Sequence, residues 1–377
     1  MKIAIIRQRY NPFGGAERFV ERALSALVAE GAEVTLITRS WAGAPRADFR
    51  QIICDPAYSR WWGGRAARDR SFAQAALQAV RAGGFDITQS HERIPGCMIF
   101  RAGDGVHAAW LQHRARQLGY WGRLGLQLSA YHRYVLGVEK AMFAHPALRT
   151  VICNSRMVAD ELSAFYGLPA DRLAVIYNGI DPEVFHPGLA GQYRAETRQQ
   201  AGIPADVPLL LYVGSGFERK GVPQLLRAFA AMQTREARLV IVGADRKLKA
   251  MQGLAAKLGV ARRVLFTGPL QDVRPWYGAA DAFVLPTLYD PCPNAALEAL
   301  ACGLPTVTTT GCGAKEWIKD GENGWVVDAL SVAALTAALD NSCVLGRQPE
   351  ARAKAHAAVA ELTLAAMAAR LLALYRR

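Results

Sequence analysis

The sequence predicts an α/β protein with two domains, each built on a doubly wound parallel sheet. Short β-branched runs alternate with amphipathic helical patterns along the chain, which is typical of parallel sheets made of strand–helix units. The length of 377 residues exceeds what one hydrophobic core usually organises. The alternation stops once, in the Pro- and Gly-containing stretch NGIDPEVFHPG at 178–188, and then restarts. We therefore expect domains at 1–180 and 188–360, facing a cleft.

Ten short runs are the expected strands. Ligands of open parallel sheets bind beyond the carboxyl ends of the strands, so we expect the functional residues in the loops that follow these runs. A helix, AERFVERALSALVAEG, should follow the first strand. The runs are KIAIIRQ, EVTLITR, DITQS, TVICNS and LAVIYNG in the first domain, and LLLYVGS, RLVIVGA, VLFTG, AFVLPT and TVTTT in the second.

Charge and composition restrict the classes of partner. Lys and Arg number 45 against 32 Asp and Glu, a net charge of +13, which favours an anionic partner: nucleic acid, a membrane surface or a phosphorylated substrate. Hydrophobic residues make up 51%, as in globular proteins, and no apolar run reaches the ~18 residues of a membrane span. The start of the chain has too short an apolar core for a signal peptide, so we expect a cytoplasmic protein. Seven widely spread cysteines without a CxxC pair predict neither a zinc site nor a disulfide framework.

Two glycine-containing loops are candidates for phosphate binding. Gly14 and Gly15 lie between the first strand and its helix, where the backbone can approach a ligand, although an ordinary turn would look the same. The segment 214–221, GSGFERKG, begins like a dinucleotide fingerprint, but Arg219 stands where the third glycine belongs. This excludes a dehydrogenase site. Arg219 and Lys220 instead predict a diphosphate site, with a solvated surface pair as the alternative.

The segment YDPCPNAALEALACGLP at 289–305 carries two carboxylates. Glu298 lies in an otherwise apolar helix expected at 294–302, and a carboxylate in such company needs a partner, for which vicinal ribose hydroxyls are suitable. Asp290 precedes the helix and could accept hydrogen bonds from sugar hydroxyls. The alternative is an exposed helix carboxylate and a turn aspartate.

Together these motifs resemble those of retaining glycosyltransferases of family 4, which have the GT-B fold. The resemblance rests on Asp290 and Glu298 eight positions apart, on Arg219-Lys220, and on GGAER at 14–18 and NGID at 178–181. It implies that Glu298 holds the nucleotide ribose and that Arg219 and Lys220 hold the diphosphate. It further implies that Asp290 and the backbone around Asn294 and Ala295 hold the donor sugar, that Gly15 approaches the phosphate, that no metal or cofactor is needed, and that a last helix at about 361–377 joins the first domain.

Within the family, the sequence resembles the lipopolysaccharide core glucosyltransferase type. The shared stretches are NPFGG at 11–15, IPG at 94–96 followed by FRAGD at 100–104, and GSGFERKG at 214–221; Phe19 and the turn DPCPN depart from that type. The resemblance implies transfer of a hexosyl group from a UDP-sugar, such as UDP-glucose, to a lipopolysaccharide core or similar lipid-linked saccharide. A nucleotide-sugar epimerase, a GDP-sugar-dependent transferase on another glycan and a nucleic-acid binder are the alternatives; no nucleic-acid motif is found.

The acceptor is expected near Asp104, which lies in a glycine-containing loop and could orient the acceptor hydroxyl or take its proton, with His107 as the substitute candidate. Residues 101–150 hold seven basic and two acidic side chains, interleaved with aromatic residues and leucines. Such a segment suits the surface of an anionic inner leaflet and could present a phosphorylated glycolipid to the enzyme. The alternative is a helical pair with core aromatics. The residues expected at the membrane or acceptor are His107, Arg114, Arg116, Trp121 and Arg123.

Overall fold

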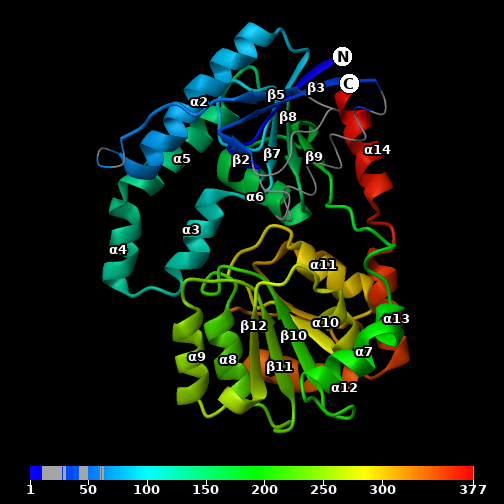
Figure 1. Ribbon diagram of the computed structural model, residues 1–377. Helices are drawn as coiled ribbons and strands as arrows, with labels where there is room; N and C mark the ends of the chain where they lie inside the picture. Colours follow the sequence, from blue (N-terminus) through cyan, green and yellow to red (C-terminus); the bar gives the residue numbers. More distant parts are fainter. Residues whose placement is uncertain (11–27, 29–30, 42–49, 60, 62, 377) are drawn as a thin grey trace. The chain divides into compact units, whose positions relative to one another are not determined.

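The chain divides into two compact units in a computed structural model that describes every residue except 11–27, 29–30, 42–49, 60, 62 and 377 (Figure 1). Unit 1 comprises Met1–Gly179 together with Leu364–Arg377, and unit 2 comprises Ile180–Thr363.

Unit 1 is built on a seven-stranded parallel sheet with the order β5-β3-β1-β6-β7-β8-β9. From β1 the chain adds β3 and β5 on one side, and it then returns to the other side of β1 with β6. The point at which the strand order reverses therefore lies between β1 and β6, where ligands of open sheets bind. The strands are β1 Lys2–Ile6, β3 Glu33–Thr38, β5 Arg50–Ile53, β6 Ile87–Ser90, β7 Ile99–Ala102, β8 Thr150–Cys153 and β9 Leu173–Val175, with the separate pair β2 Arg9–Tyr10 and β4 Ser40–Trp41.

Helices pack on both faces of this sheet. Successive side chains of β1 point to opposite faces, so both faces carry apolar side chains that a helix can cover. On one face, Ala4 and Ile6 pack with Phe72 of helix α2 (Gly64–Gly83). On the other face, Ile3 and Ile5 share a core with Met367, Leu371 and Tyr375 of α14 (Leu364–Tyr375). The last helix is thus part of the core of unit 1 (Figure 1).

Three mutually contacting helices follow β7 in unit 1: α3 His107–Ala115, α4 Tyr120–Leu128 and α5 Ala130–Phe143. Helix α5 buries Val135, Met142 and Phe143, and the hydroxyl of Ser129 accepts a hydrogen bond from the backbone N–H of His132 at its start. Helix α4 buries none of its side chains. The unit also contains α6 Arg156–Tyr166 and the 3₁₀ turn η1 Ala170–Arg172.

Unit 2 repeats the design with six parallel strands in the order β12-β11-β10-β13-β14-β15, so its strand order reverses between β10 and β13. Its strands are β10 Leu209–Val213, β11 Arg238–Val242, β12 Val264–Gly268, β13 Ala282–Val284, β14 Thr306–Thr309 and β15 Gly324–Val327. Its helices are α7 Leu189–Gln200, α8 Val222–Ala231, α9 Leu248–Lys257, α10 Arg274–Ala279, α11 Asn294–Ala301, α12 Val332–Leu345 and α13 Pro349–Val359, with 3₁₀ turns η2 Ala261–Arg263 and η3 Gly313–Trp317.

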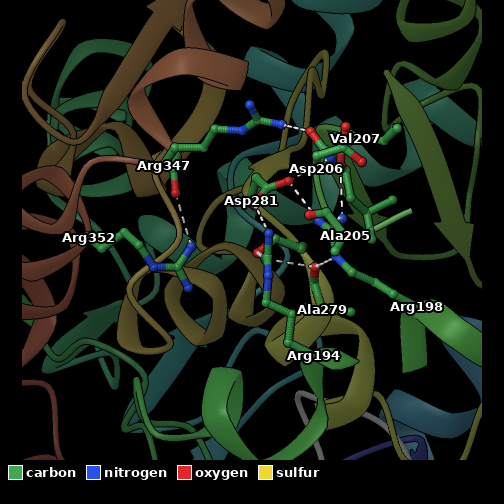
Figure 2. A network of polar contacts seen from close by, with 12 residues as sticks. Arg194, Arg198, Ala205, Asp206, Val207, Ala279, Asp281, Arg347 and Arg352 are labelled. Atoms are coloured by element: carbon green, nitrogen blue, oxygen red, sulfur yellow. Dashed lines mark hydrogen bonds and ion pairs between the residues drawn. The ribbon is translucent and has the colours of Figure 1, made fainter. Parts of the chain in front are cut away.

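A buried ionic network fixes the amino ends of β10 and β13 side by side (Figure 2). Asp281, 1% exposed, receives hydrogen bonds from the Nη2 atoms of Arg194 and Arg198 at 2.6 and 2.8 Å and from the backbone N–H of Leu209 at 2.8 Å. Arg198 also donates to the carbonyls of Ala279 and Val207, both at 2.9 Å. Helix α7 is thereby tied to the two strands between which the strand order reverses.

The prediction of two doubly wound parallel sheets is confirmed. Strands occur within all ten predicted runs, whereas β2, β4, β5, β7 and β15 were not predicted because their short sequences show no clear alternation. Most of the helix expected after the first strand lies outside the described residues. Among the described residues, the helices are all too short or too polar to cross a bilayer.

Candidate active site

The predicted phosphate-binding loop of unit 2 is hydrogen-bonded to the loop that carries Asp290. The carbonyl of Arg219 accepts hydrogen bonds from the backbone N–H of Leu288 at 2.9 Å and from Thr287 Oγ1 at 3.2 Å. Gly221 permits this approach, since a Cβ atom there would lie 1.9 Å from the carbonyl oxygen of Pro286. The loops after β10 and β13 therefore meet at the reversal of strand order.

Two cations and one carboxylate lie together at this place. Lys220 Nζ is 3.1 Å from Asp290 Oδ2, and Arg219 Nη1 is 3.6 Å from the same oxygen. Arg219 Nη1 also donates to the carbonyl of Tyr289 at 2.9 Å. The side chain of Arg219 is 42% exposed, whereas those of Lys220 and Asp290 are 14% and 11% exposed. The site can thus offer positive charge to an anionic group that reaches it from solvent.

Asp245 orders the same loop from the carboxyl end of β11. Its carboxylate accepts hydrogen bonds from the backbone N–H groups of Phe217 at 2.8 Å and Lys247 at 2.7 Å. Burial alone would raise the pKa of Asp245, but the N–H groups of Lys247 and Phe217 lower it below its usual value. Asp245 was not predicted from the sequence, although its place three residues after the end of β11, a predicted strand, was a usable signal.

Glu298 projects from α11, the short helix that begins at Asn294. The hydroxyl of the fully buried Tyr277 lies 3.1 Å from Glu298 Oε2 and 3.2 Å from the carbonyl oxygen of Ala295. Pro293 precedes the helix, and its carbonyl accepts hydrogen bonds from the backbone N–H groups of Ala296 and Leu297 at 3.1 and 3.4 Å. The predicted helix and its carboxylate are therefore present at the expected positions.

A cavity of about 170 Å³ lies within unit 1 at the carboxyl ends of β1, β6 and β7. Asp104 lines it, as do Gln8, Glu92 and Arg93 after the strands. Helices α2 and α5 complete the described wall with Arg68, Asp69, Phe72, Tyr131, Tyr134, Val135 and Val138. The cavity thus coincides with the reversal of strand order in unit 1.

Most polar groups of this cavity already have protein partners. Arg68 and Gln8 donate to Asp69 Oδ1 at 2.9 and 3.2 Å, and Arg93 donates to the buried Glu139 at 2.7 Å. Asp104 is exposed and forms no hydrogen bond or ion pair with any described residue. Burial raises the pKa of Glu92, and the negative charge of Asp104 adds to this increase. The charge of Arg7 and the hydrogen bond from the N–H of Gln8 lower the pKa and so oppose it.

His107, at the start of α3, is held more firmly than Asp104. Its Nε2 lies 3.2 Å from His132 Nδ1, its ring stacks on Trp110, and its backbone N–H donates to Glu139 at 2.9 Å. Burial, followed by the charge of Arg93, lowers the pKa of His107 to about 4, so the imidazole is neutral at neutral pH.

Comparison with known proteins identifies the family. The Glycosyl transferases group 1 pattern matches residues 193–356, and the Glycosyltransferase Family 4 pattern matches residues 13–184. The lipopolysaccharide glucosyltransferase WaaG of Escherichia coli K12 is 30% identical over 87% of this chain and 85% of its own length. The chain belongs to glycosyltransferase family 4.

Solved glycosyltransferases share the architecture. The crystal structure of WaaG, described as a glycosyltransferase of lipopolysaccharide biosynthesis, superposes with a TM-score of 0.82 and 26% identity over 99% of both chains. The structure of HepE of Anabaena in complex with UDP-glucose has a TM-score of 0.70 and 20% identity over 100% of this chain and 99% of that one. The GT-B fold expected from the sequence is confirmed, and family membership does not favour the epimerase alternative.

Some predicted residues of this glycosyltransferase are not tested by the structure. Gly14 and Gly15 lie outside the described residues. Within the part of the chain that is described, no three His, Cys, Asp or Glu side chains are grouped as ligands for a metal ion.

The basic and aromatic segment at 101–150 divides into two parts. Tyr131 and Tyr134 line the cavity, with guanidinium groups of Arg65 and Arg70 4.5 and 5.3 Å from their ring centres. Arg101 is buried and donates to Asn178, so it cannot contact a membrane. The exposed side chains, by contrast, include those of Arg114, Arg116, Tyr120, Trp121, Arg123 and Leu128, and, farther along the segment, those of Arg133, Lys140 and Arg149.

Proposed function

We propose that this glycosyltransferase moves a hexosyl group from a UDP-sugar to a lipopolysaccharide core or similar lipid-linked saccharide, with retention of the anomeric configuration. The meeting of Arg219 and Lys220 at the reversal of strand order in unit 2 carries this proposal. The name of WaaG as a lipopolysaccharide glucosyltransferase and the UDP-glucose complex of HepE support the choice of substrates.

In the proposed donor site, Arg219 and Lys220 stabilise the negative charge that develops on the departing diphosphate. Glu298 accepts hydrogen bonds from the ribose hydroxyls, and the N–H groups of Asn294 and Ala295, with Asp290, bind the sugar. Gly15, which lies outside the described residues, is proposed to approach the phosphate, as the family resemblance implies. Two side-chain cations supply the charge that a metal ion would otherwise provide, so the transfer is metal-independent. Retention requires the attacking hydroxyl and the leaving diphosphate to share one face of the sugar.

The acceptor is proposed to bind unit 1 at the cavity beside Asp104. The carboxylate of Asp104 is available to orient the acceptor hydroxyl or to take its proton, because no described residue occupies it. His107 is less suited, since His132 and Trp110 hold its ring. Asp104→Asn should therefore abolish most transfer while donor binding persists, whereas His107→Ala should have the smaller effect on transfer.

We also propose that the protein is cytoplasmic and binds the inner leaflet through the exposed side chains of α3 and α4. Tyr120 and Trp121 are 74% and 79% exposed, and Arg114, Arg116 and Arg123 lie on the same two helices or beside them. Anionic lipid contributes about 1 kcal/mol per basic residue near the surface, so three together give reversible binding.

Vesicle flotation tests this surface. Binding should rise with the fraction of anionic lipid, fall with salt, and decrease when Arg114, Arg116 and Arg123 are neutralised together. The matched control neutralises Arg227, Arg235 and Arg262, three exposed arginines of unit 2. Equal binding of the two triple variants contradicts the proposed surface.

The function itself is tested with a panel of donors. Thermal unfolding with UDP, GDP, ADP and their hexose conjugates should show the largest stabilisation by uridine compounds. Transfer from the best donor to a truncated lipopolysaccharide acceptor should then proceed in the presence of EDTA. Failure of every nucleotide to bind contradicts the proposal, and conversion of a donor without any acceptor would favour the epimerase alternative.

A further inference from the structure

The carboxylate of Asp290 is placed against the two cations that are proposed to bind the donor diphosphate. Its Oδ2 atom lies 3.1 Å from Lys220 Nζ and 3.6 Å from Arg219 Nη1. We propose that Asp290 is an internal counter-ion of the diphosphate site and promotes release of the nucleoside diphosphate product. This inference rests on the proposed donor site but assigns Asp290 a role beyond contact with the sugar.

Asp290 is fixed by its own backbone. Its N–H donates to the carbonyl of Gly311 at 3.0 Å, and its carbonyl accepts from the N–H of Gly313 at 2.9 Å. The residue is 8% exposed, and an aspartate side chain has only one methylene group with which to move its carboxylate. The negative charge therefore stays close to the cations when an anion approaches them.

The cations are also held in place. The N–H of Lys220 donates to the carbonyl of Gly216 at 3.0 Å, and the Lys220 stem passes directly over Gly214, where a Cβ atom would lie 3.1 Å from Lys220 Cδ. Arg219 is anchored through the carbonyl of Tyr289 at 2.9 Å. Two positive charges and one negative charge thus share a small volume, with a net charge of +1 and not +2.

A diphosphate oxygen that binds Lys220 Nζ must come within a few ångströms of Asp290. Like charges at such a distance repel appreciably in a partly buried site, where the effective dielectric constant is well below that of water. The two cations attract the diphosphate, and Asp290 weakens the attraction. When the product leaves, Asp290 regains both ion pairs. Since product release often limits turnover in enzymes, this weakening can increase kcat.

Asp290→Asn tests the inference because asparagine keeps the shape and an oxygen for Lys220 but removes the charge. We expect the Kd of UDP, measured by calorimetry, to fall by roughly tenfold. The Kd of uridine, which has no phosphate, should not change. Under saturating donor and acceptor, kcat should fall and inhibition by added UDP should strengthen. Asp290→Glu, which keeps the charge, should bind UDP more like the wild type.

Glu322→Gln is the matched control, since it removes an exposed carboxylate from the pair with Lys354 in the same unit and should leave the UDP affinity unchanged. Thermal unfolding checks that each variant is folded; if Asp290→Asn is not, Asp290→Ser removes the charge in a smaller side chain. Unchanged or weaker UDP binding by the folded variant overturns the inference. In particular, unchanged UDP binding with weaker UDP-glucose binding would assign Asp290 to the sugar alone. If the wild type binds no nucleoside diphosphate, the proposed function fails instead.

Discussion

The hydroxyl of Tyr277 lies 3.1 Å from Glu298 Oε2, so a fully buried tyrosine of α10 holds one oxygen of the proposed ribose-binding carboxylate. The ring of Tyr277 is itself fixed by the rings of Phe185 and Phe283, with centroids 5.7 and 6.2 Å away. This hydrogen bond fixes the orientation of the Glu298 carboxylate. It makes Tyr277 a positioning residue for the nucleotide site.

Tyr277→Phe should therefore weaken binding of UDP by roughly three- to tenfold, the effect of losing one hydrogen bond to a charged group. The loss should depend on the ribose: it should be smaller for 2′-deoxy-UDP, which keeps only one of the two vicinal hydroxyls that Glu298 is proposed to bind. Calorimetric titration of both nucleotides into both proteins gives the coupling energy. An equal loss for UDP and 2′-deoxy-UDP would mean that Tyr277 only stabilises the fold. Glu298→Gln, which removes the charge of the carboxylate itself, should weaken the binding of UDP further.

Arg219 and Lys220 should each contribute strongly to the chemical step. Replacing either with alanine should reduce kcat by roughly 10²–10³, as for the loss of other groups that stabilise developing charge. Lys257→Ala, at the exposed far end of α9, removes a positive charge from the same unit and should leave kcat unchanged. Steady-state assays at saturating donor measure the difference. Near-normal turnover by either alanine variant would remove that residue from the mechanism.

The local features of the proposed donor site were predicted from the sequence alone, but the contacts between them were not. The position of Arg219 and Lys220 after a buried strand and of Glu298 on a helix follows from periodicity, which is a local property. The ion pair between Lys220 and Asp290 depends on β10 lying beside β13, a neighbour distant in sequence. The Tyr277–Glu298 bond likewise joins two helices, so neither contact was visible in the sequence pattern.

The same distinction holds in unit 1. Asp104 was predicted from its glycine-containing loop, but Glu92, Asp69 and Tyr131 were not assigned to the same site. Glu92 follows a predicted strand, so the rule that ligands bind at carboxyl ends of strands could have found it. Asp69 and Tyr131 come from α2 and α5, and only the packing of these helices brings them to the cavity.

The neutral His107 should make the stability of unit 1 sensitive to mild acid. Burial is the main reason that the pKa of His107 is lowered to about 4, whereas histidine in an unfolded chain titrates near ~6.5. Between these values the unfolded chain binds the additional proton, so stability is lost as the pH falls from about 6.5 towards 4. The pKa of His132 is lowered too, mainly by burial, and acts in the same direction.

Thermal unfolding at pH 7 and pH 5 measures this effect. The Tm of the wild type should be lower at pH 5 than at pH 7. The difference in Tm between the two pH values should be smaller for His107→Gln, because glutamine does not titrate. His145→Gln serves as a histidine control in the same unit and should keep the dependence of the wild type. If the His107 variant loses as much Tm as the wild type, the titration of this histidine is not the cause.

Asp281→Asn should be among the most destabilising single substitutions in unit 2. Asp281 is the carboxylate between Arg194 and Arg198, and the latter guanidinium is 3% exposed at its side chain, so the change leaves a buried cation without its counter-charge (Figure 2). Breaking a buried ion pair in this way typically costs about 3–5 kcal/mol. The carbonyls of Ala279 and Val207, which accept hydrogen bonds from Arg198, moderate the loss but do not neutralise the charge.

Urea unfolding should show the loss of stability in Asp281→Asn. The control Asp206→Asn changes an exposed aspartate and should alter stability by less than about 0.5 kcal/mol. Asp281 also accepts a hydrogen bond from the backbone N–H of Leu209, the first residue of β10, so the folded fraction of Asp281→Asn should bind UDP more weakly than the Asp206 variant. Equal stability of the two variants would show that the network is not required to hold β10 against β13.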